Sequence, residues 1–135
     1  MHIPAAATGI CQPLDIYFFR LFKRFIRRIN SYVMRCEPTF VLYQRDNILK
    51  MTSAVYRQFC SPVFHNCFKY AWYAAGYVDD HPPAFSTPTD YCFNDVPVTV
   101  PCQEFGGCTE IGFIRCVMCD KRLCFSCFIP DYHQC

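Results

Sequence analysis

The chain has 135 residues, of which 53% are hydrophobic and only 18% are charged, and its formal net charge is +2. This composition excludes intrinsic disorder for most of the chain, because disorder requires low hydrophobicity and high net charge, and the length fits a single domain. The longest apolar run, residues 70–78, is far shorter than the roughly 20 residues of a transmembrane helix. Residues 1–9 lack the basic and apolar regions of a secretory signal, so we expect no membrane partner and a reducing compartment.

Charge is distributed unevenly along the chain. Residues 1–76 carry ten Lys and Arg against three Asp and Glu, whereas residues 77–135 carry three against eight. Such an asymmetry indicates segments with different roles. We therefore expect a helical unit over residues 1–76, a Pro-rich linker over residues 77–101 and a Cys-rich module over residues 102–135. The last is too short to fold without an additional cross-link.

The first predicted helix begins near Asp15 and ends at Glu37-Pro38, because a residue before proline is pushed out of the helical region. Asp15 is its candidate N-cap, since an Asp side chain can accept hydrogen bonds from the free N–H groups of a first turn. One face is apolar at the 3.6-residue period and comprises Phe18, Phe22, Phe25, Ile26, Ile29 and Val33.

The opposite face of this helix is strongly basic. Its cationic side chains are Arg20, Lys23, Arg24, Arg27 and Arg28, with Arg35 near the end of the helix. Such a stripe can neutralise phosphates and bind nucleic acid with strong salt dependence, because binding releases counterions. The alternative is a solvated face without a ligand; the clustering of charge favours nucleic-acid binding.

Two further helices are predicted. The second spans Asp46 to Cys60, with Asp46 as a cap candidate and an apolar face of Ile48, Met51, Val55 and Phe59. The third follows Ser61-Pro62, an N-cap with proline at the first helical position, and ends at Gly76. Its apolar residues are Val63, Phe64, Cys67, Phe68, Ala71, Trp72 and Ala75. The predicted fold class is therefore mainly α, with three helices that can bury one another.

Seven of the 12 cysteines lie between Cys102 and Cys135, and two C-x2-C pairs stand among them. Two intervening residues allow a tight turn to present both thiolates to a tetrahedral ion, so these pairs predict structural zinc. Eight candidate ligands suffice for two Zn²⁺. Because only four residues separate the two pairs, we favour interleaved sites in a small, irregular, β-poor cross-brace. One site would use Cys102, Cys108, Cys124 and Cys127, and the other Cys116, Cys119, His133 and Cys135.

Other interpretations of the cysteines remain open. Cys102 and Cys108 have looser spacing and could be buried free thiols, and a disulfide framework is disfavoured because no signal sequence precedes it. A site with four protein ligands is structural, since no position is left for water or substrate. The remaining five cysteines lack ligand spacing, and we expect them to be buried.

The N-terminal sequence resembles a known family. The run HIPAAATGICQPLDIYFFRLFK, residues 2–23, resembles the I-P-P-x-x-T-x-x-x-Q-P-L-D-x-x-x-F-x-x-x-K block of DDE-superfamily endonucleases of the mariner/pogo type. Ala5 departs from it, where the family has a second proline. These endonucleases are DNA transposases with a ribonuclease-H-like core, so residues 1–76 would be a C-terminal remnant of such a core. Less specifically, the resemblance extends through residues 70–88.

The resemblance implies a catalytic role for Asp15, as the third acidic residue of the DDE set. Three carboxylates are needed because two Mg²⁺ ions must be held together to activate the attacking oxygen and stabilise the leaving one. The family's other two acids lie upstream of this block, so Mg²⁺ would bind only in a complete parent enzyme. We therefore expect no nuclease activity from this chain alone.

The Cys-rich end is similar to the C-terminal finger of piggyBac-type transposases, which binds transposon-end DNA or chromatin partners. The similarity rests on the two C-x2-C pairs with Tyr132 and His133. Together, these features predict a transposase-derived, nuclear protein that binds DNA, either non-specifically or at transposon ends. The alternative is a zinc cross-brace that binds a protein partner, as RING-like or chromatin-reading fingers do, in the nucleus or the cytoplasm.

Overall fold

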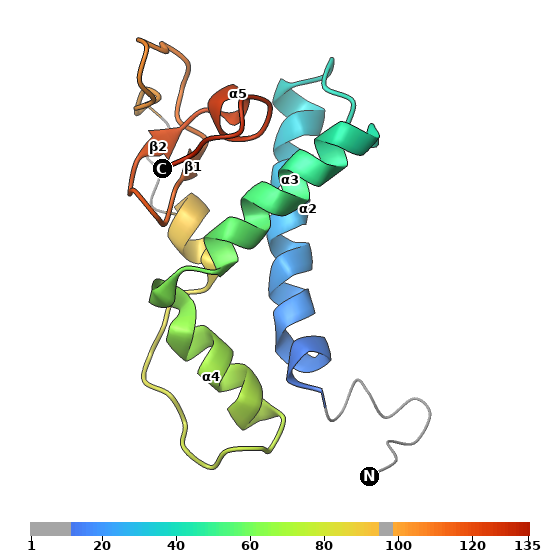
Figure 1. The fold of residues 1–135 in the computed structure, drawn as a ribbon, viewed down its shortest axis with the longest axis vertical. Helices are drawn as coiled ribbons and strands as arrows, with labels where there is room; N and C mark the ends of the chain where they lie inside the picture. Colours follow the sequence, from blue (N-terminus) through green and yellow to red (C-terminus); the bar gives the residue numbers. More distant parts are fainter. Residues whose placement is uncertain (1–11, 95–98) are drawn as a thin grey trace.

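The computed structural model describes residues 12–94 and 99–135 (Figure 1). The predicted motif residues before Gln12 lie outside this part of the chain. A π-helical turn, Leu14–Phe18, leads into α2 (Phe19–Cys36), which is followed by α3 (Arg45–Phe59). A 3₁₀ turn, Pro62–Phe64, then leads into α4 (His65–Ala74). The three predicted helices are thus confirmed, and the described chain is mainly helical.

Short elements make up the rest of the fold. A second π-helical turn spans Asp90–Asn94, and β1 (Ile114–Arg115) pairs with β2 (Arg122–Leu123) in an antiparallel sheet that aligns Ile114 with Leu123. A single turn, α5 (Phe125–Phe128), follows. The Cys-rich segment is therefore β-poor, as predicted. None of the helices in the described residues is both long and apolar enough to span a membrane.

Two predicted helix caps are wrong and one is confirmed. The first helical turn is preceded by Pro13 and α3 by Gln44, so Asp15 and Asp46 lie inside the first turns and neither serves as the cap. Acidic side chains still favour this position, because the helix dipole is positive there. Ser61 caps the next segment as predicted, since its Oγ accepts a hydrogen bond from the Val63 N–H at 3.4 Å.

Aromatic rings fill the contact between α2 and α3. The fully buried Phe59 of α3 lies 5.5–5.6 Å, between ring centroids, from Phe18, Phe22 and Phe25. Leu21, which was not placed on the predicted apolar face, is buried as well. Such edge-on ring pairs contribute about 0.5–1.5 kcal/mol each beyond the area they bury.

Three residues of the predicted apolar faces are instead exposed: Ile48, Val63 and Trp72. Ile48 stands in the first turn of α3, and the buried residues of that helix begin only at Met51. Trp72 packs edge-on against Tyr77, at 5.5 Å between ring centroids, outside the core. Helical periodicity therefore identifies the buried face of each helix, but it does not indicate how much of that face other segments cover.

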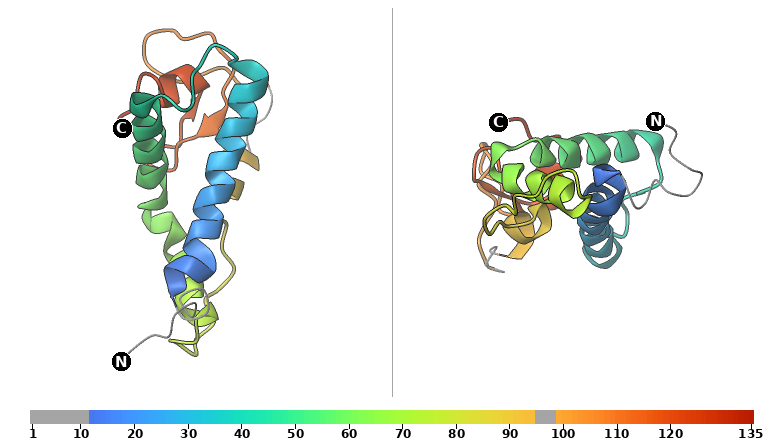
Figure 2. Two further views of the ribbon diagram at one scale, coloured as in Figure 1. Left: turned by 90° about the vertical axis from the view of Figure 1, so that its right-hand side faces the viewer. Right: turned by 90° about the horizontal axis from the view of Figure 1, so that it is seen from below.

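The Cys-rich segment packs on the helices near the end of α2 that is opposite the turn Leu14–Phe18 (Figures 1 and 2). Tyr32 of α2 lies 4.0 Å from Phe113 and 5.9 Å from Phe125, and Phe40 lies 5.0 Å from Phe125, all between ring centroids. On α3, Lys50 donates to the Pro130 carbonyl at 2.9 Å. Helices and Cys-rich segment consequently share one hydrophobic cluster.

The described part of the predicted linker also joins this core. Residues 78–87 have no regular structure, yet Pro82, Pro88, Cys92 and Phe93 are buried. The Phe93 ring lies 4.9 Å from that of Phe25 and 5.4 Å from that of Phe113, between centroids. Phe93 therefore connects α2 to the Cys-rich segment.

Candidate metal centres

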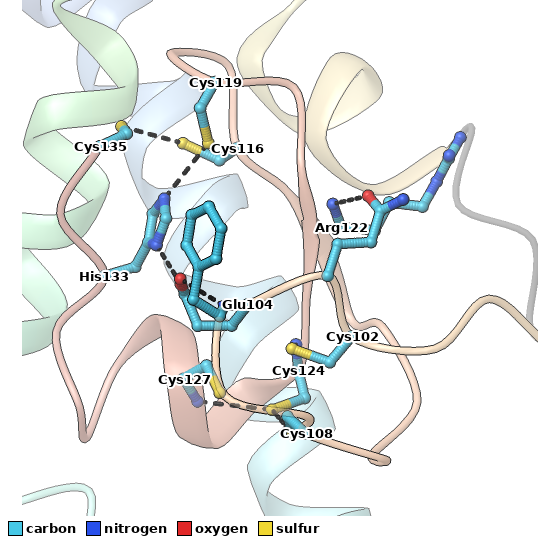
Figure 3. Close-up of polar contacts among 12 residues, drawn as sticks. Cys102, Glu104, Cys108, Cys116, Cys119, Arg122, Cys124, Cys127, His133 and Cys135 are labelled. Atoms are coloured by element: carbon cyan, nitrogen blue, oxygen red, sulfur yellow. Dashed lines mark hydrogen bonds and ion pairs between the residues drawn. The ribbon is translucent and has the colours of Figure 1, made fainter.

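The first candidate centre, site 1, gathers four cysteines from two parts of the chain. Cys102 and Cys108 flank a loop that is closed by a hydrogen bond from the Cys102 N–H to the Glu110 carbonyl at 2.7 Å. Cys124 is the N-cap of α5 and Cys127 lies within that turn. The four Sγ atoms lie within 4.8 Å of one another, and those of Cys108 and Cys124 are 3.8 Å apart (Figure 3).

The second candidate centre, site 2, combines a turn with the chain end. Cys116 and Cys119 occupy the turn between β1 and β2, which Asp120 closes with a left-handed φ of 63° and an N–H donated to the Cys116 carbonyl at 2.8 Å. His133 and Cys135 approach from beyond α5. The Sγ atoms of Cys116 and Cys135 are 3.8 Å apart, and Nε2 of His133 lies 3.3 Å from Sγ of Cys119.

The spacing of the donor atoms in both sites is compatible with bound zinc. Zn–S bonds of about 2.3 Å at tetrahedral angles place sulfur atoms about 3.8 Å apart, and one sulfur pair in each site is separated by 3.8 Å. The same spacing is far beyond the roughly 2.05 Å of a disulfide bond, and the cysteines of the described residues are all free thiols. Each site offers four donors, of soft thiolate and imidazole type.

The structure assembles these eight residues in the two interleaved sets that the spacing favours. The four-residue connection between the C-x2-C pairs supplies β2, whose pairing with β1 holds the two pairs in separate sites. Of the other cysteines in the described residues, Cys67 and Cys92 are buried, as expected. Cys36 and Cys60 are exposed, which corrects the expectation for them.

Thiol acidity differs within each site. Burial raises the pKa of Cys119 and of Cys124 to about 11. Burial also acts on Cys116, but hydrogen bonds from the Cys119 N–H and from Gln58 outweigh it and lower the pKa of this thiol. Hydrogen bonds from backbone N–H groups likewise outweigh burial at Cys102 and lower its pKa. Each site therefore contains one thiol whose negative charge the fold already stabilises.

Two polar residues that were not among the predicted site residues contact donor residues of site 2. Gln58, buried in α3, donates from Nε2 to Sγ of Cys116 at 3.5 Å and accepts from the Val117 N–H at 2.8 Å. The Glu104 carboxylate contacts Nδ1 of His133, on the side of the ring opposite Cys119 (Figure 3). Burial raises the pKa of Glu104, but hydrogen bonds from the Phe105 N–H and His133 outweigh this and hold it below its usual value.

A signal for one of these residues was present in the sequence. Gln58 interrupts the apolar face of the second helix, next to Phe59, and a polar residue on a buried face requires a partner. Glu104 offered no comparable signal, because nothing in the spacing places it beside His133, 29 residues away in the chain.

Asp15, the predicted catalytic residue, lies far along the chain from both centres. It is half-buried in the π-helical turn Leu14–Phe18. In the part of the chain that the structure describes, neither cluster that could hold a metal includes it.

The predicted basic face is exposed along α2. Arg24 approaches Asp90 at 3.4 Å, and the guanidinium of Arg28 lies 5.7 Å from the centroid of the Phe93 ring. Arg24, Arg27 and Arg28 line a shallow depression between α2 and the turn at Asp90–Asn94. All six predicted basic residues are accessible to a ligand: Arg20, Lys23, Arg24, Arg27, Arg28 and Arg35.

The Cys-rich segment brings together two sets of four donor atoms, interleaved around a minimal sheet, and each set could hold a metal ion. Residues 72–135, a little under half of the chain, match the Tc5 transposase C-terminal domain family. This match supports a transposase-derived protein. No curated protein and no solved structure shows significant similarity to the chain.

Proposed function

We propose that this chain is a transposase-derived DNA-binding protein whose Cys-rich segment is folded by two structural zinc ions. The observation that carries this proposal is the coincidence of both donor sets with the segment that matches the Tc5 transposase C-terminal domain. Zinc fits best, because cysteine-rich tetrahedral sets are its usual structural ligands. A closed set of four protein ligands gives the metal a role in folding and none in catalysis.

The exposed basic face of α2 is the proposed DNA-binding surface. Its side chains lie on one side of a helix of 18 residues, about 27 Å long at 1.5 Å per residue. A helix of this length can follow several successive phosphates, and neutralising them releases counterions. Because the proposed partner is DNA, we propose that the protein acts in the nucleus.

We further propose a relationship of the N-terminal part to DDE endonucleases of the mariner/pogo type, with Asp15 as the counterpart of their third acidic residue. In this proposal the helices are the remnant of a ribonuclease-H-like core, and Mg²⁺ catalysis belongs to a complete parent enzyme. The Cys-rich segment would act like the piggyBac-type finger at transposon ends. A single acidic residue does not hold two Mg²⁺ ions, so the chain alone has no nuclease activity.

DNA affinity measured against salt tests the binding proposal. We expect a linear fall of log K with log salt concentration, with a slope near −0.9 for each phosphate neutralised. A slope near zero would contradict the DNA-binding surface and favour a zinc cross-brace that binds protein. A nicking assay tests the rest: metal-dependent turnover that Asp15→Ala abolishes would overturn the proposed lack of nuclease activity.

A further inference from the structure

Glu104 is held between two hydrogen-bond donors, one local and one distant. Its Oε1 accepts from the N–H of Phe105 at 3.1 Å, and its Oε2 contacts Nδ1 of His133 (Figure 3). The His133 side chain is only 3% exposed. Because water is excluded from this contact on the imidazole side, the carboxylate fixes the orientation of the ring.

The contact also determines which nitrogen of His133 is available to a metal. When Nδ1 carries the proton and donates it to Glu104, the lone pair of the neutral ring lies on Nε2. Nε2 is the atom that faces site 2, 3.3 Å from Sγ of Cys119. A carboxylate behind a ligating histidine, with its proton on the far nitrogen, raises the basicity of the ligand and holds its ring in place.

The position of Glu104 depends in turn on site 1. Glu104 lies in the loop whose two ends, Cys102 and Cys108, are both donors of that site. The loop is also fastened to β2 next to Glu104, where Gln103 exchanges two hydrogen bonds with the backbone of Arg122, each 2.8 Å long. A metal ion at site 1 would therefore fix the segment from which the carboxylate reaches His133.

We infer that Glu104 is a positioning residue that couples the two metal sites, so that an ion at site 1 increases the affinity of site 2. This inference rests on the proposed zinc binding. Coupling of this kind is reciprocal, so an ion at site 2 strengthens site 1 by the same factor. The Cys-rich segment then acquires its two ions cooperatively, although no donor is shared between them.

Titration of the metal-free, reduced protein with Co²⁺ tests this inference. The visible absorption of Co²⁺ distinguishes the four-sulfur set of site 1 from the three-sulfur, one-nitrogen set of site 2. Glu104→Ala should weaken site 2 by about 10- to 100-fold, the usual cost of losing such a supporting residue. Glu104→Gln should retain part of the affinity, because its amide oxygen can still accept a hydrogen bond from the Nδ1–H group of His133. Glu110→Ala is the matched control: it removes an exposed acidic side chain of the same segment, keeps the backbone carbonyl that accepts from the Cys102 N–H, and should leave both sites unchanged.

Disabling site 1 tests the coupling directly. Cys108→Ser should weaken Co²⁺ binding at site 2 in the unaltered protein but produce little further loss in the Glu104→Ala background. In the zinc-loaded protein, nitrogen NMR should show that the His133 ring carries its proton on Nδ1. Glu104→Ala should shift this Nδ1 resonance, and the shift can be measured even if Glu104→Ala and Cys108→Ser fold less well than the unaltered protein.

Failure of the coupling through Glu104 can be distinguished from failure of the proposed metal binding. If the unaltered protein binds no Co²⁺ or Zn²⁺, the metal sites themselves are wrong and the coupling falls with them. If it binds two ions and Glu104→Ala leaves the affinity of site 2 unchanged, the metal sites stand and the role of Glu104 is overturned.

Discussion

Gln58 of α3 donates a hydrogen bond to Sγ of Cys116, with 3.5 Å between Nε2 and sulfur, and so joins the helical part of the chain to site 2. The oxygen of the same amide accepts a hydrogen bond from the Val117 N–H at 2.8 Å, and this bond orients the turn that carries Cys116 and Cys119. One buried side chain thus supports both the packing of this turn on α3 and the charge of a thiolate.

Gln58→Ala should lower the free energy of unfolding by about 1–3 kcal/mol, because it leaves the buried Val117 N–H without a partner. It should also reduce zinc affinity, since Cys116 loses a donor. Urea unfolding of the zinc-loaded protein measures the first effect and a competing chelator the second. Thr52→Ala, at an exposed position on the same helix, should change neither quantity appreciably; equal losses in both variants would rule out a special role for Gln58.

Removal of metal should weaken α3 as well as the Cys-rich segment. Arg57 donates to the His133 carbonyl at 3.1 Å, and Phe125, in the turn of Cys124 and Cys127, belongs to the shared hydrophobic cluster. Metal binding contributes directly to folding in such segments. With chelator, amide hydrogen exchange should accelerate across residues 102–135 and also in the second half of α3. Loss of protection confined to residues 102–135 would contradict this coupling.

Cysteine reactivity should follow burial outside the metal sites. At pH 8, alkylation of the folded protein should modify the exposed Cys36 and Cys60 before the buried Cys67, because the thiolate is the reactive form. Burial raises the pKa of Cys67 from 9.0 to about 11. Since the folded state holds this proton more tightly, the stabilising contribution is complete below about pH 9 and is lost as the pH rises through about 11. Mass spectrometry after timed alkylation measures these rates. If Cys67 is modified as fast as Cys36, the burial of Cys67 and its raised pKa are contradicted.

Single substitutions on α2 test the DNA-binding surface. Arg27→Ala should weaken binding to all DNA sequences alike and reduce the salt slope by about one unit, as expected for the loss of one phosphate contact. Arg45→Ala removes the same charge from an exposed position at the start of α3 and serves as the control. If both variants lose the same affinity, net charge alone governs binding and α2 has no special role.

Much of the fold could be predicted from local patterns. The apolar period located the helices, and Glu37-Pro38 correctly ended the first. The predicted caps at Asp15 and Asp46 were wrong. Asp is common both at the N-cap and within the first turn, so its presence does not show where the first helical hydrogen bond forms. The extent of burial along each helix could not be predicted either, since it depends on which other segments pack against that helix.

The candidate metal sites were more accessible to prediction than their surroundings. Ligand spacing is a local property, so the short connection between the C-x2-C pairs was enough to favour interleaving. The contacts of Glu104 with His133 and of Gln58 with Cys116 join residues 29 and 58 positions apart. Only the folded chain brings such pairs together, and a single sequence contains no period that reports them.

The most direct test of the account is native mass spectrometry of the reduced, zinc-loaded protein. We expect two zinc ions per chain, with one lost from a Cys124→Ser variant at site 1 and both removed by a strong chelator with recovery of free thiols. A protein that retains no metal, or whose residues 102–135 are linked by disulfides, would contradict it.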